Sequence, residues 1–382
     1  MQHRFAELLP RQRTPSSAHC LECATQLEEW EGQAGPRTYL FTAREIAHAL
    51  REVARGLSYR RAAEEARLVG RRVRGAQPRP VPGLHRPRWR QQKRSAAADG
   101  QLVANWMDVF APVVLTGELP TYWPERIAVD SAEFRIAGGN KAGMSFNVFI
   151  AVGYEPGDTK GRLWRMEAFP RRTAADWGEF FGRLTGTPKL IVSDMDTAIR
   201  NAAAASFPRG SAPAPEIRIC EHHLKGAIRR ALSPIAGNPQ HPVLLALERA
   251  LLSAHDWAGF EQLVRQTHSP QTPLLTMINW LNRYSSLVEQ QVQTRPYPGP
   301  FSTGAAEAFG KEISARFDRR SYVLSNRRRT NLLLDLFTLD LTNRVDERLW
   351  AEKLRHTLAL RDGFAPHQRQ HDDPAGRSSL VA

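Results

Sequence analysis

RIAVDSAEFRI, at residues 126–136, is the stretch of sequence that decides the fold class. Its apolar start and the alternation of apolar and polar residues that follows are typical of a β-strand. MSFNVFIAVGYE (144–155) and RLWRMEAFP (162–170) have the same character and predict two more strands. Asp130 lies inside the first strand, directly after the apolar residues Ile127–Val129. The first predicted strand therefore carries an acidic residue in an otherwise apolar segment.

Helical and strand segments then alternate along the chain. They are TAADWGEFFGRL (173–184), KLIVSD (189–194), the helix through 197–206, and IRICEHH (217–223). Thr173 is the candidate N-cap of the first helix, and Asp196 is the candidate N-cap of the second. This run of strands and helices over residues 125–223 predicts an α/β core.

Residues 224–300 carry no strand signal and predict an all-helical insertion. Four segments have helical periodicity: LKGAIRRAL (224–232), PVLLALERALLSAH (242–255), WAGFEQLVRQT (257–267) and LLTMINWLNRYSSLVEQQV (274–292). The Pro-rich break RPYPGP (295–300) ends them. We expect a helix pair over residues 301–361 to complete the core, and a polar tail over residues 362–382.

The charge of the chain favours a nucleic-acid partner. The formal net charge is +14, and residues 1–98 hold 19 Lys and Arg against nine Asp and Glu. Proteins that neutralise phosphates carry such a concentrated excess. Only seven of the 53 basic residues are Lys, so a compositional bias toward Arg is an alternative explanation for part of the excess.

The composition also bears on the cellular location. The longest apolar runs, such as Phe146–Gly153, are shorter than the ~20 residues that a membrane span needs. The N-terminus lacks an apolar segment of signal-peptide length, and the three cysteines provide no disulfide framework. We therefore expect a cytoplasmic protein with no membrane partner.

Residues 39–112 predict a helix-turn-helix DNA-binding region. Three helices are expected, at FTAREIAHALREVAR (41–55), SYRRAAEEARL (58–68) and DGQLVANWMDVFAP (99–112). A Thr42–Glu45 capping box starts the first helix, and Gly56 ends it. A helix, a glycine turn and a second helix have the spacing of a helix-turn-helix. An ordinary amphipathic helical hairpin is the alternative.

The Arg/Pro/Gly-rich segment at 70–98 predicts a basic arm within this region. It holds too little apolar surface to fold alone, so we expect it to be extended or disordered without DNA. Guanidinium groups bind phosphate and guanine bidentately. DNA contacts are expected from Arg60, Arg61, Arg71 and Arg72.

Cys20 and Cys23 in the N-terminal segment 1–38 provide half of a zinc site. A structural Zn²⁺ ion takes four ligands, and His3 and His19 are the other candidate ligands upstream. A degenerate zinc knuckle is one interpretation of this segment. A pair of small, semi-buried cysteines is the other.

Asp130 and Asp194 are the candidate catalytic carboxylates. Two-metal cleavage of a phosphodiester needs carboxylates that converge from rigid elements. Asp194 ends the buried strand at 189–194, where a side chain points into the crevice at the carboxyl edge of a sheet. For either residue alone, capping of a turn or of the following helix is the alternative.

From residue 125 to about residue 345, the chain resembles the Mutator-type (MULE-like) bacterial insertion-sequence transposases, a DDE family with an RNase H-like catalytic fold. Four segments carry the resemblance: VDSAEF (129–134), VSDMDTAIRNAAAASFP (192–208), CEHH (220–223) and STGAAEAFGKEISARFDRR (302–320). The resemblance implies that Asp130, Asp194 and Glu307 are the acidic catalytic residues. It also implies a helical insertion between the second Asp and the Glu.

The resemblance departs from the family pattern at Gly304, where the family often has Asn. Glu312 is therefore the alternative to Glu307 as third acidic residue. Cys220 and His223 fit the family's Cys-x-x-His element. We expect them to position the substrate or support the structure, because thiolate and imidazole are softer ligands than Mg²⁺ prefers.

The resemblance further implies the cofactors and partners. The three acidic residues would hold two Mg²⁺ ions, for which Mn²⁺ can substitute. The DNA partners would be the terminal inverted repeats of the transposon and the target DNA, and joining two ends implies at least a homodimer. Basic residues after the third acid are expected to bind phosphates of the transposon end, with a solvated basic surface as the alternative: Arg316, Arg319, Arg320 and Arg327–Arg329.

The sequence as a whole predicts an α/β RNase H-like catalytic core with an all-helical insertion, preceded by a helical helix-turn-helix DNA-binding domain. The expected function is Mg²⁺-dependent DNA transposition in a bacterial cytoplasm, in association with the nucleoid. A domesticated or inactive transposase that binds DNA without cutting it is one alternative. An RNase H-like nuclease that cleaves without joining is another.

Overall fold

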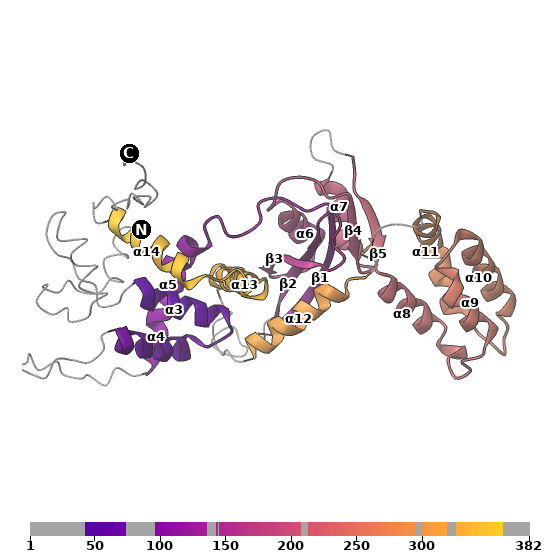
Figure 1. Ribbon diagram of the computed structural model, residues 1–382. Coiled ribbons are helices and arrows are strands. Elements are labelled where there is room, and N and C mark those ends of the chain that lie inside the picture. The colour runs from indigo at the N-terminus through magenta and orange to yellow at the C-terminus, as the bar shows by residue number, and fades with distance from the viewer. Residues whose placement is uncertain are drawn as a thin grey trace, which may run out of the picture. The chain divides into compact units, whose positions relative to one another are not determined.

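The computed structural model describes residues 43–73, 96–135, 143, 145–207, 213–294, 299–300, 302–318 and 326–361. The chain divides into two compact units (Figure 1). One unit comprises Met1–Glu118 with Asn343–Ala382, and the other comprises Leu119–Thr342. Three predicted features lie outside the described residues: the N-terminal segment 1–38, most of the basic arm, and the tail 362–382.

A five-stranded mixed sheet forms the centre of the second unit. Its strands are β1 (Arg126–Arg135), β2 (Ser145–Tyr154), β3 (Arg162–Phe169), β4 (Leu190–Ser193) and β5 (Glu216–Ile219). They lie in the order β3-β2-β1-β4-β5. The pairs β1–β2 and β2–β3 are antiparallel, whereas β1–β4 and β4–β5 are parallel. The prediction of an α/β class is confirmed at this level.

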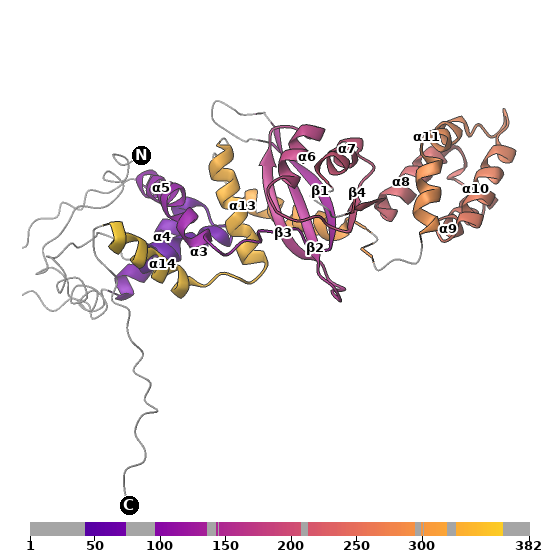
Figure 2. The ribbon, with the colours of Figure 1, turned by 90° about the horizontal axis from the view of Figure 1, so that it is seen from above.

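One face of the sheet is covered by α6 (Ala174–Phe181) and α7 (Thr197–Ser206), as Figure 2 shows. Phe149 of β2 stacks on Trp177 of α6, with ring centroids 3.8 Å apart. Thr173 caps α6 through a capping box with Asp176, which confirms the predicted N-cap. The aromatic cluster around these rings fixes α6 against the sheet.

The opposite face of the sheet receives α12 (Gly304–Phe317). A Cβ atom on Gly310 would lie 3.5 Å from Cδ1 of Ile150 and 3.6 Å from Cβ of Ala132, so the helix backbone approaches β1 and β2 closely. At the edge of the sheet, α13 (Arg327–Leu341) packs against β3. These two helices lie on either side of the gap in the described chain at residues 319–325.

The described residues of the insertion form helices joined by turns, with no strand among them. It contains α8 (Glu221–Ala231), the short 3₁₀-helix Ser233–Ile235, α9 (Pro242–Ala250), α10 (Ala254–Thr267) and α11 (Leu275–Gln293). These helices share a hydrophobic cluster of their own. The boundary between the predicted helices 242–255 and 257–267 lies earlier than expected, because Ser253 accepts from the Asp256 N–H and caps α10, which begins at Ala254.

The side chain of Gln291 joins this insertion to the sheet. Its Oε1 accepts from the backbone N–H of Ile219 at 2.9 Å, and its Nε2 donates to the carbonyl of the same residue at 3.0 Å. Nη1 of the buried Arg218 donates to the Gln291 carbonyl at 2.9 Å. Hydrogen bonds therefore join β5 to α11 immediately before α8 begins.

The described residues of the first unit form α3 (Ala43–Ala54), α4 (Tyr59–Val73), α5 (Ala96–Leu115) and α14 (Glu347–Arg361). Gly56, at φ 97°, makes the predicted turn between α3 and α4. The helix α4 continues past Gly70, so the predicted arm at 70–98 is helical at both of its ends. A glycine within a helix costs only about 1 kcal/mol, and the arginines around it favour helix. In the described part of the chain, no helix has the length and apolar character needed to cross a membrane.

The helix α14 corrects the predicted organisation of the C-terminal part. The segment 301–361, expected as a helix pair in the core, contains three helices where the structure describes it, and the third packs against α3 and α5. Trp350 and Leu354, one turn apart on α14, are fully buried there. Nζ of Lys353 donates to the carbonyl of Thr116 at 2.8 Å. The apolar face of α14 is therefore buried in the first unit.

Candidate active site

β1 places Asp130 on the face of the sheet that α12 covers. Side chains alternate along a strand, so Asp130 shares a face with Ala132 and Phe134. Ala132 lies against Gly310, and Phe134 packs edge-to-face on an aromatic ring of α12. Oδ1 of the half-buried Asp130 accepts from the backbone N–H of Ser131 at 2.7 Å.

Asp194 lies beside Asp130 at the end of the neighbouring strand. β1 and β4 pair in parallel, with Ala128 opposite Val192. Two residues further in this register, β1 reaches Asp130 and the chain after β4 reaches Asp194. Oδ1 of Asp194 accepts from the N–H of Asp196 at 2.9 Å, and Asp196 caps α7 as predicted.

The first turn of α12 carries Glu307 toward the same part of the sheet. Glu307 and Gly310 are three residues apart, so they lie on the same face of the helix. Gly310 lies over Ala132 and Ile150, and Ile150 is the register partner of Asp130. The face of α12 that touches the sheet next to Asp130 is therefore the face that carries Glu307.

Thr303, directly before α12, links Glu307 to the Cys-x-x-His element. Its hydroxyl donates to Oε1 of Glu307 at 3.2 Å and lies 3.3 Å from Nδ1 of His223. Its backbone N–H donates to Sγ of the buried Cys220 at 3.3 Å. Nε2 of His223 lies 3.7 Å from Oε1 of Glu307. The element after β5 and the start of α12 thus form one hydrogen-bonded assembly.

Burial and neighbouring charges shift the pKa values of the aspartates. Burial raises the pKa of Asp130 to about 6, and the carboxylates of Asp194 and Glu307 act in the same direction. The hydrogen bond from the Ser131 N–H and the charge of His223 lower it. Burial also raises the pKa of Asp194, and His223 again opposes the shift. Asp130 therefore interacts electrostatically with both of the other acidic residues.

The donor atoms of this neighbourhood suit a hard divalent cation, since Mg²⁺ prefers carboxylate oxygens. Among the described residues, the recorded hydrogen-bond partners of the Asp130 and Asp194 carboxylates are backbone N–H groups rather than Lys or Arg side chains. Within the same ranges, no group of three or more His, Cys, Asp or Glu side chains is placed to hold a metal ion. The residue types fit Mg²⁺, whereas the side-chain spacing does not form a chelating set.

Glu312, the alternative third acidic residue, is exposed on α12. It lies five residues after Glu307, so it points to a different side of the helix. The pKa of Asp130 responds to Glu307, and Glu312 is not among the charges that shift it. This geometry favours Glu307 over Glu312 as the partner of the two aspartates.

The described basic residues predicted to contact DNA fall into two groups. Arg60 and Arg61 are exposed on α4, where Arg60 pairs with Glu64 at 3.5 Å. In contrast, Nη2 of Arg316 pairs with Asp340 of α13 at 2.8 Å, so this side chain joins two helices. The side chains not described are those of Arg71, Arg72, Arg319, Arg320, Cys20 and Cys23.

Arg327 also has protein partners. It pairs with Glu179 at 3.0 Å, and its Nε donates to the carbonyl of Ala168 at 2.8 Å. The guanidinium group lies 4.4 Å from the ring centroid of Phe169. Arg328, the next residue, is exposed. The Arg327–Arg329 run therefore includes a residue that fastens α13 to the edge of the sheet.

Two residues near the acidic group were missed by the sequence analysis. Thr303 is buried. Its position directly before the predicted helix of Glu307 is the one feature of the sequence that could have indicated a role at the site. The exposed Arg172 donates from Nη1 to Oγ of Ser131 at 3.3 Å, and its charge lowers the pKa of Asp194. No feature of the sequence around Arg172 distinguishes it from the other arginines of the chain.

Comparison with known proteins assigns no family to the chain. A scan against protein-family models finds no match, and a search of curated proteins finds none either.

Proposed function

We propose that this chain is a DNA transposase of the DDE type, which cleaves transposon ends and transfers the 3′-hydroxyl strands into target DNA. One observation carries the proposal. Asp130, Asp194 and Glu307, which are far apart in the sequence, come from β1, the end of β4 and the first turn of α12 to one face of the sheet. Convergent carboxylates on rigid elements are what phosphodiester cleavage by divalent cations requires.

The fold supports an RNase H-like assignment for the second unit. A mixed sheet with two antiparallel and two parallel strand pairings brings the ends of β1 and β4 together. The helical insertion lies between the second Asp and the Glu, which is where the resemblance to Mutator-type transposases places it. The Cys-x-x-His element at Cys220 and His223 contacts the start of α12, so it has a structural reason to lie beside the third acidic residue.

The residues of the site have distinct roles in this proposal. Asp130, Asp194 and Glu307 would hold two Mg²⁺ ions, or Mn²⁺ ions. When bound, such ions activate the attacking hydroxyl and stabilise the leaving oxygen. Thr303 and His223 act as positioning residues, because both contact Glu307 and limit the orientations that its carboxylate can adopt.

The charge of the chain and its helical unit support DNA as the partner. The net charge is +14, and α3, the turn at Gly56 and α4 follow the helix-turn-helix pattern. Arg60 and Arg61 are exposed on α4, where they can reach phosphates. Because cut-and-paste transposition joins two ends, the active complex would contain at least two copies of the chain.

A transposase derivative that binds DNA without cutting it is the second candidate. The observation that favours it is the spacing of the acidic side chains. Within the described ranges, no three of them lie close enough together to hold a metal ion. In this case the chain would still bind DNA through its basic surface but would not catalyse DNA cleavage. An RNase H-like nuclease, which cleaves without joining, is the third candidate.

A strand-transfer assay distinguishes these candidates. Purified full-length protein is incubated with Mg²⁺, target DNA and labelled duplexes that carry the sequences flanking its gene. The transposase is expected to give nicked ends and joined products. Asp194→Asn should lose both while still binding DNA, and Glu312→Gln, the matched control on exposed α12 surface, should keep both. Cleavage without joining would indicate a nuclease, and binding without cleavage by the wild type would indicate an inactive derivative.

A further inference from the structure

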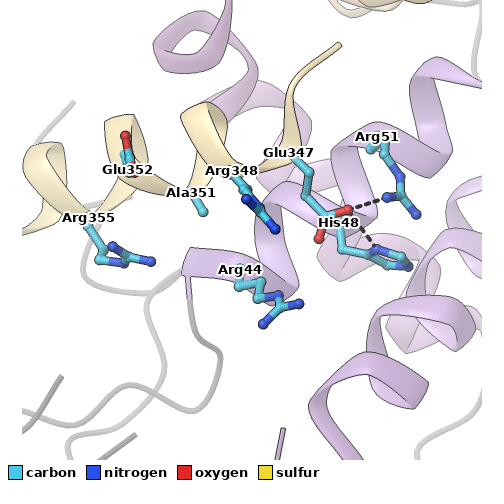
Figure 3. Close-up of a pocket in the computed structure, with 8 residues that line it drawn as sticks. All are labelled: Arg44, His48, Arg51, Glu347, Arg348, Ala351, Glu352 and Arg355. Atoms are coloured by element: carbon cyan, nitrogen blue, oxygen red, sulfur yellow. Dashed lines mark hydrogen bonds and ion pairs between the residues drawn. The ribbon is translucent and has the colours of Figure 1, made fainter. Parts of the chain in front are cut away.

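A strongly charged pocket lies between α3 and α14 in the first unit. Its volume is about 580 Å³ (Figure 3). Arg44, His48 and Arg51 line it from α3, whereas Arg348 and Arg355 line it from α14. Figure 3 shows these side chains extending from the two helices on either side of the pocket. The pocket therefore exists because the C-terminal helix packs on the N-terminal helices.

The carboxylate of Glu347 at one end of this pocket is neutralised by α3. Its Oε2 lies 3.1 Å from Nδ1 of His48 and forms an ion pair with Arg51. Burial raises the pKa of Glu347, but His48 and Arg51 outweigh it, so the pKa is lowered overall. Arg51 also pairs with Glu52 at 2.6 Å. The charge of Arg44 also lowers the pKa of Glu347, so the charges that stabilise this carboxylate come from α3 rather than from Arg348 or Arg355.

Arg348 and Arg355 have no recorded ion pair with any residue that the structure describes. Nε of Arg355 is enclosed by protein and has no hydrogen-bond partner there. An enclosed guanidinium N–H without an acceptor is costly, so this side chain is not neutralised by its protein surroundings. Glu352, the other acidic lining residue, is exposed. The pocket therefore has an excess of positive charge directed at an acceptor from outside the chain.

The chemistry of the lining points to phosphate rather than to a nucleobase or an apolar ligand. Ala351 is the one lining residue among those described that carries neither a charge nor an imidazole. His48 is held by Glu347, and the lining has no Phe, Tyr or Trp on which a base could stack. Guanidinium groups bind phosphate oxygens bidentately. Arg348 and Arg355 can bind a phosphate in this way, because neither forms an ion pair with a carboxylate of the described residues.

We propose that this pocket binds a backbone phosphate of DNA, and that α14 is consequently part of the DNA-binding surface together with α3 and α4. The inference rests on the proposed function only in that the ligand is DNA; it does not require cleavage. It adds a phosphate contact from the C-terminal helix, in which the sequence analysis placed no DNA-binding residue. Arg348 and Arg355 make the contact. Glu347 holds α14 against α3 through its contacts with Arg51 and His48.

The test measures DNA binding as a function of salt by fluorescence anisotropy, with full-length protein that carries Asp194→Asn so that cleavage plays no part. The variant is Arg348→Gln/Arg355→Gln. Losing one phosphate contact lowers the slope of log K against log salt by about 0.9. We expect the slope to fall by about 1 and the affinity to fall at least roughly fivefold at about 0.15 M salt. Arg348→Lys/Arg355→Lys should retain most of the slope.

A charge-matched control is Arg230→Gln/Arg249→Gln, which removes two exposed arginines from α8 and α9. Thermal unfolding of all variants shows whether each one folds. An unchanged slope, or an equal fall in the control, overturns the proposal. Inorganic phosphate is titrated in parallel at constant ionic strength. If the pocket variant loses stabilisation by phosphate but binds DNA like the control, the site takes a free anion and the assignment to DNA is wrong. A wild type that binds DNA through the pocket and never cleaves it would refute the proposed function alone.

Discussion

Nε2 of His223 lies 3.7 Å from Oε1 of Glu307, and the hydroxyl of Thr303 contacts both side chains. The three residues come from the start of α8, from the segment before α12 and from α12 itself. The hydroxyl of Thr303 donates to Glu307, so it is available to accept from the imidazole Nδ1–H. Through these contacts the helical insertion is connected to the third acidic residue of the candidate site.

Thr303→Val should impair catalysis more than stability. The substitution keeps the shape of the side chain but removes the hydroxyl that orients Glu307 and His223. Loss of such a supporting hydrogen bond typically lowers metal affinity or activity by about 10- to 100-fold. Cleavage rates at several Mg²⁺ concentrations measure the effect. Thr303→Ser, which restores a hydroxyl, should recover most of the rate; equal rates for Val and wild type would show that the contact is not used.

Asp130→Asn should abolish cleavage and, in metal-free buffer, stabilise the fold. The pKa of Asp130 is raised to about 6 by burial and by the neighbouring carboxylates, so the ionised form destabilises the folded state. The cost is fully present above pH 6 and disappears as pH falls toward the unfolded-state value. We expect a gain of about 1–2 kcal/mol in the free energy of unfolding at pH 8 and a smaller gain at pH 5. Denaturant titrations at both pH values measure it, and a loss of stability at pH 8 contradicts the electrostatic account.

Gly310→Leu should displace α12 from the sheet. The Cα of Gly310 lies so near to Ile150 and Ala132 that an added Cβ would be in ordinary van der Waals contact with both side chains. Gly310→Ala is therefore expected to fold and to cleave DNA at close to the wild-type rate. A leucine side chain would require about 1–3 kcal/mol of repacking and would move Glu307 away from Asp130. Unfolding and cleavage measured for both variants separate the two effects, and an active Gly310→Leu protein would show that close packing is not needed.

Asp335 should make the second unit less stable as the pH rises. Burial raises its pKa to about 7, Arg165 lowers it and Glu167 raises it. Because the folded-state pKa lies above the unfolded-state value, the folded state binds the proton more tightly, and stability falls between about pH 4 and pH 7. Asp335→Asn should remove roughly 1–3 kcal/mol of this fall. Denaturant unfolding at pH 5 and pH 8 tests the claim, and an unchanged pH dependence in the variant would contradict it.

The strands and most helices of the second unit could be predicted from the sequence because their patterns are local. The apolar run before Asp130, the capping box at Thr173 and Asp196 at the start of α7 each act within a few residues. The division between α9 and α10 was predicted too late, at residue 256, because the apolar pattern continues through Leu251 and hides the cap at Ser253. Local signals thus determined the elements, and competing local signals caused this error.

The convergence of the acidic residues could be predicted only in part. The resemblance predicted one site formed by Asp130, Asp194 and Glu307, and the register of β1 and β4 explains why Asp130 and Asp194 are neighbours. The link that Thr303 makes to Cys220 and His223 could not be predicted, because these partners are 83 and 80 residues away in the chain. The pairing of Arg316 with Asp340 was missed for the same reason, since a surface arginine and one that joins two helices look alike in sequence.

The unit in which α14 packs could not be predicted from the sequence either. Its apolar residues predict a buried face but do not say which unit buries it. Trp350 and Leu354 pack in the first unit, next to helices that lie more than 200 residues earlier in the sequence. The pocket between α3 and α14 follows from this long-range packing, so no local pattern could have indicated it.

The claim that Asp130, Asp194 and Glu307 share divalent cations is tested most directly by Mn²⁺ binding to the purified protein, followed by electron paramagnetic resonance of the free ion. The account predicts that the wild type binds Mn²⁺, that Glu307→Gln and Asp194→Asn weaken binding at least about tenfold, and that Glu312→Gln binds like the wild type. Equal Mn²⁺ binding by the wild type and by Glu307→Gln and Asp194→Asn would contradict it.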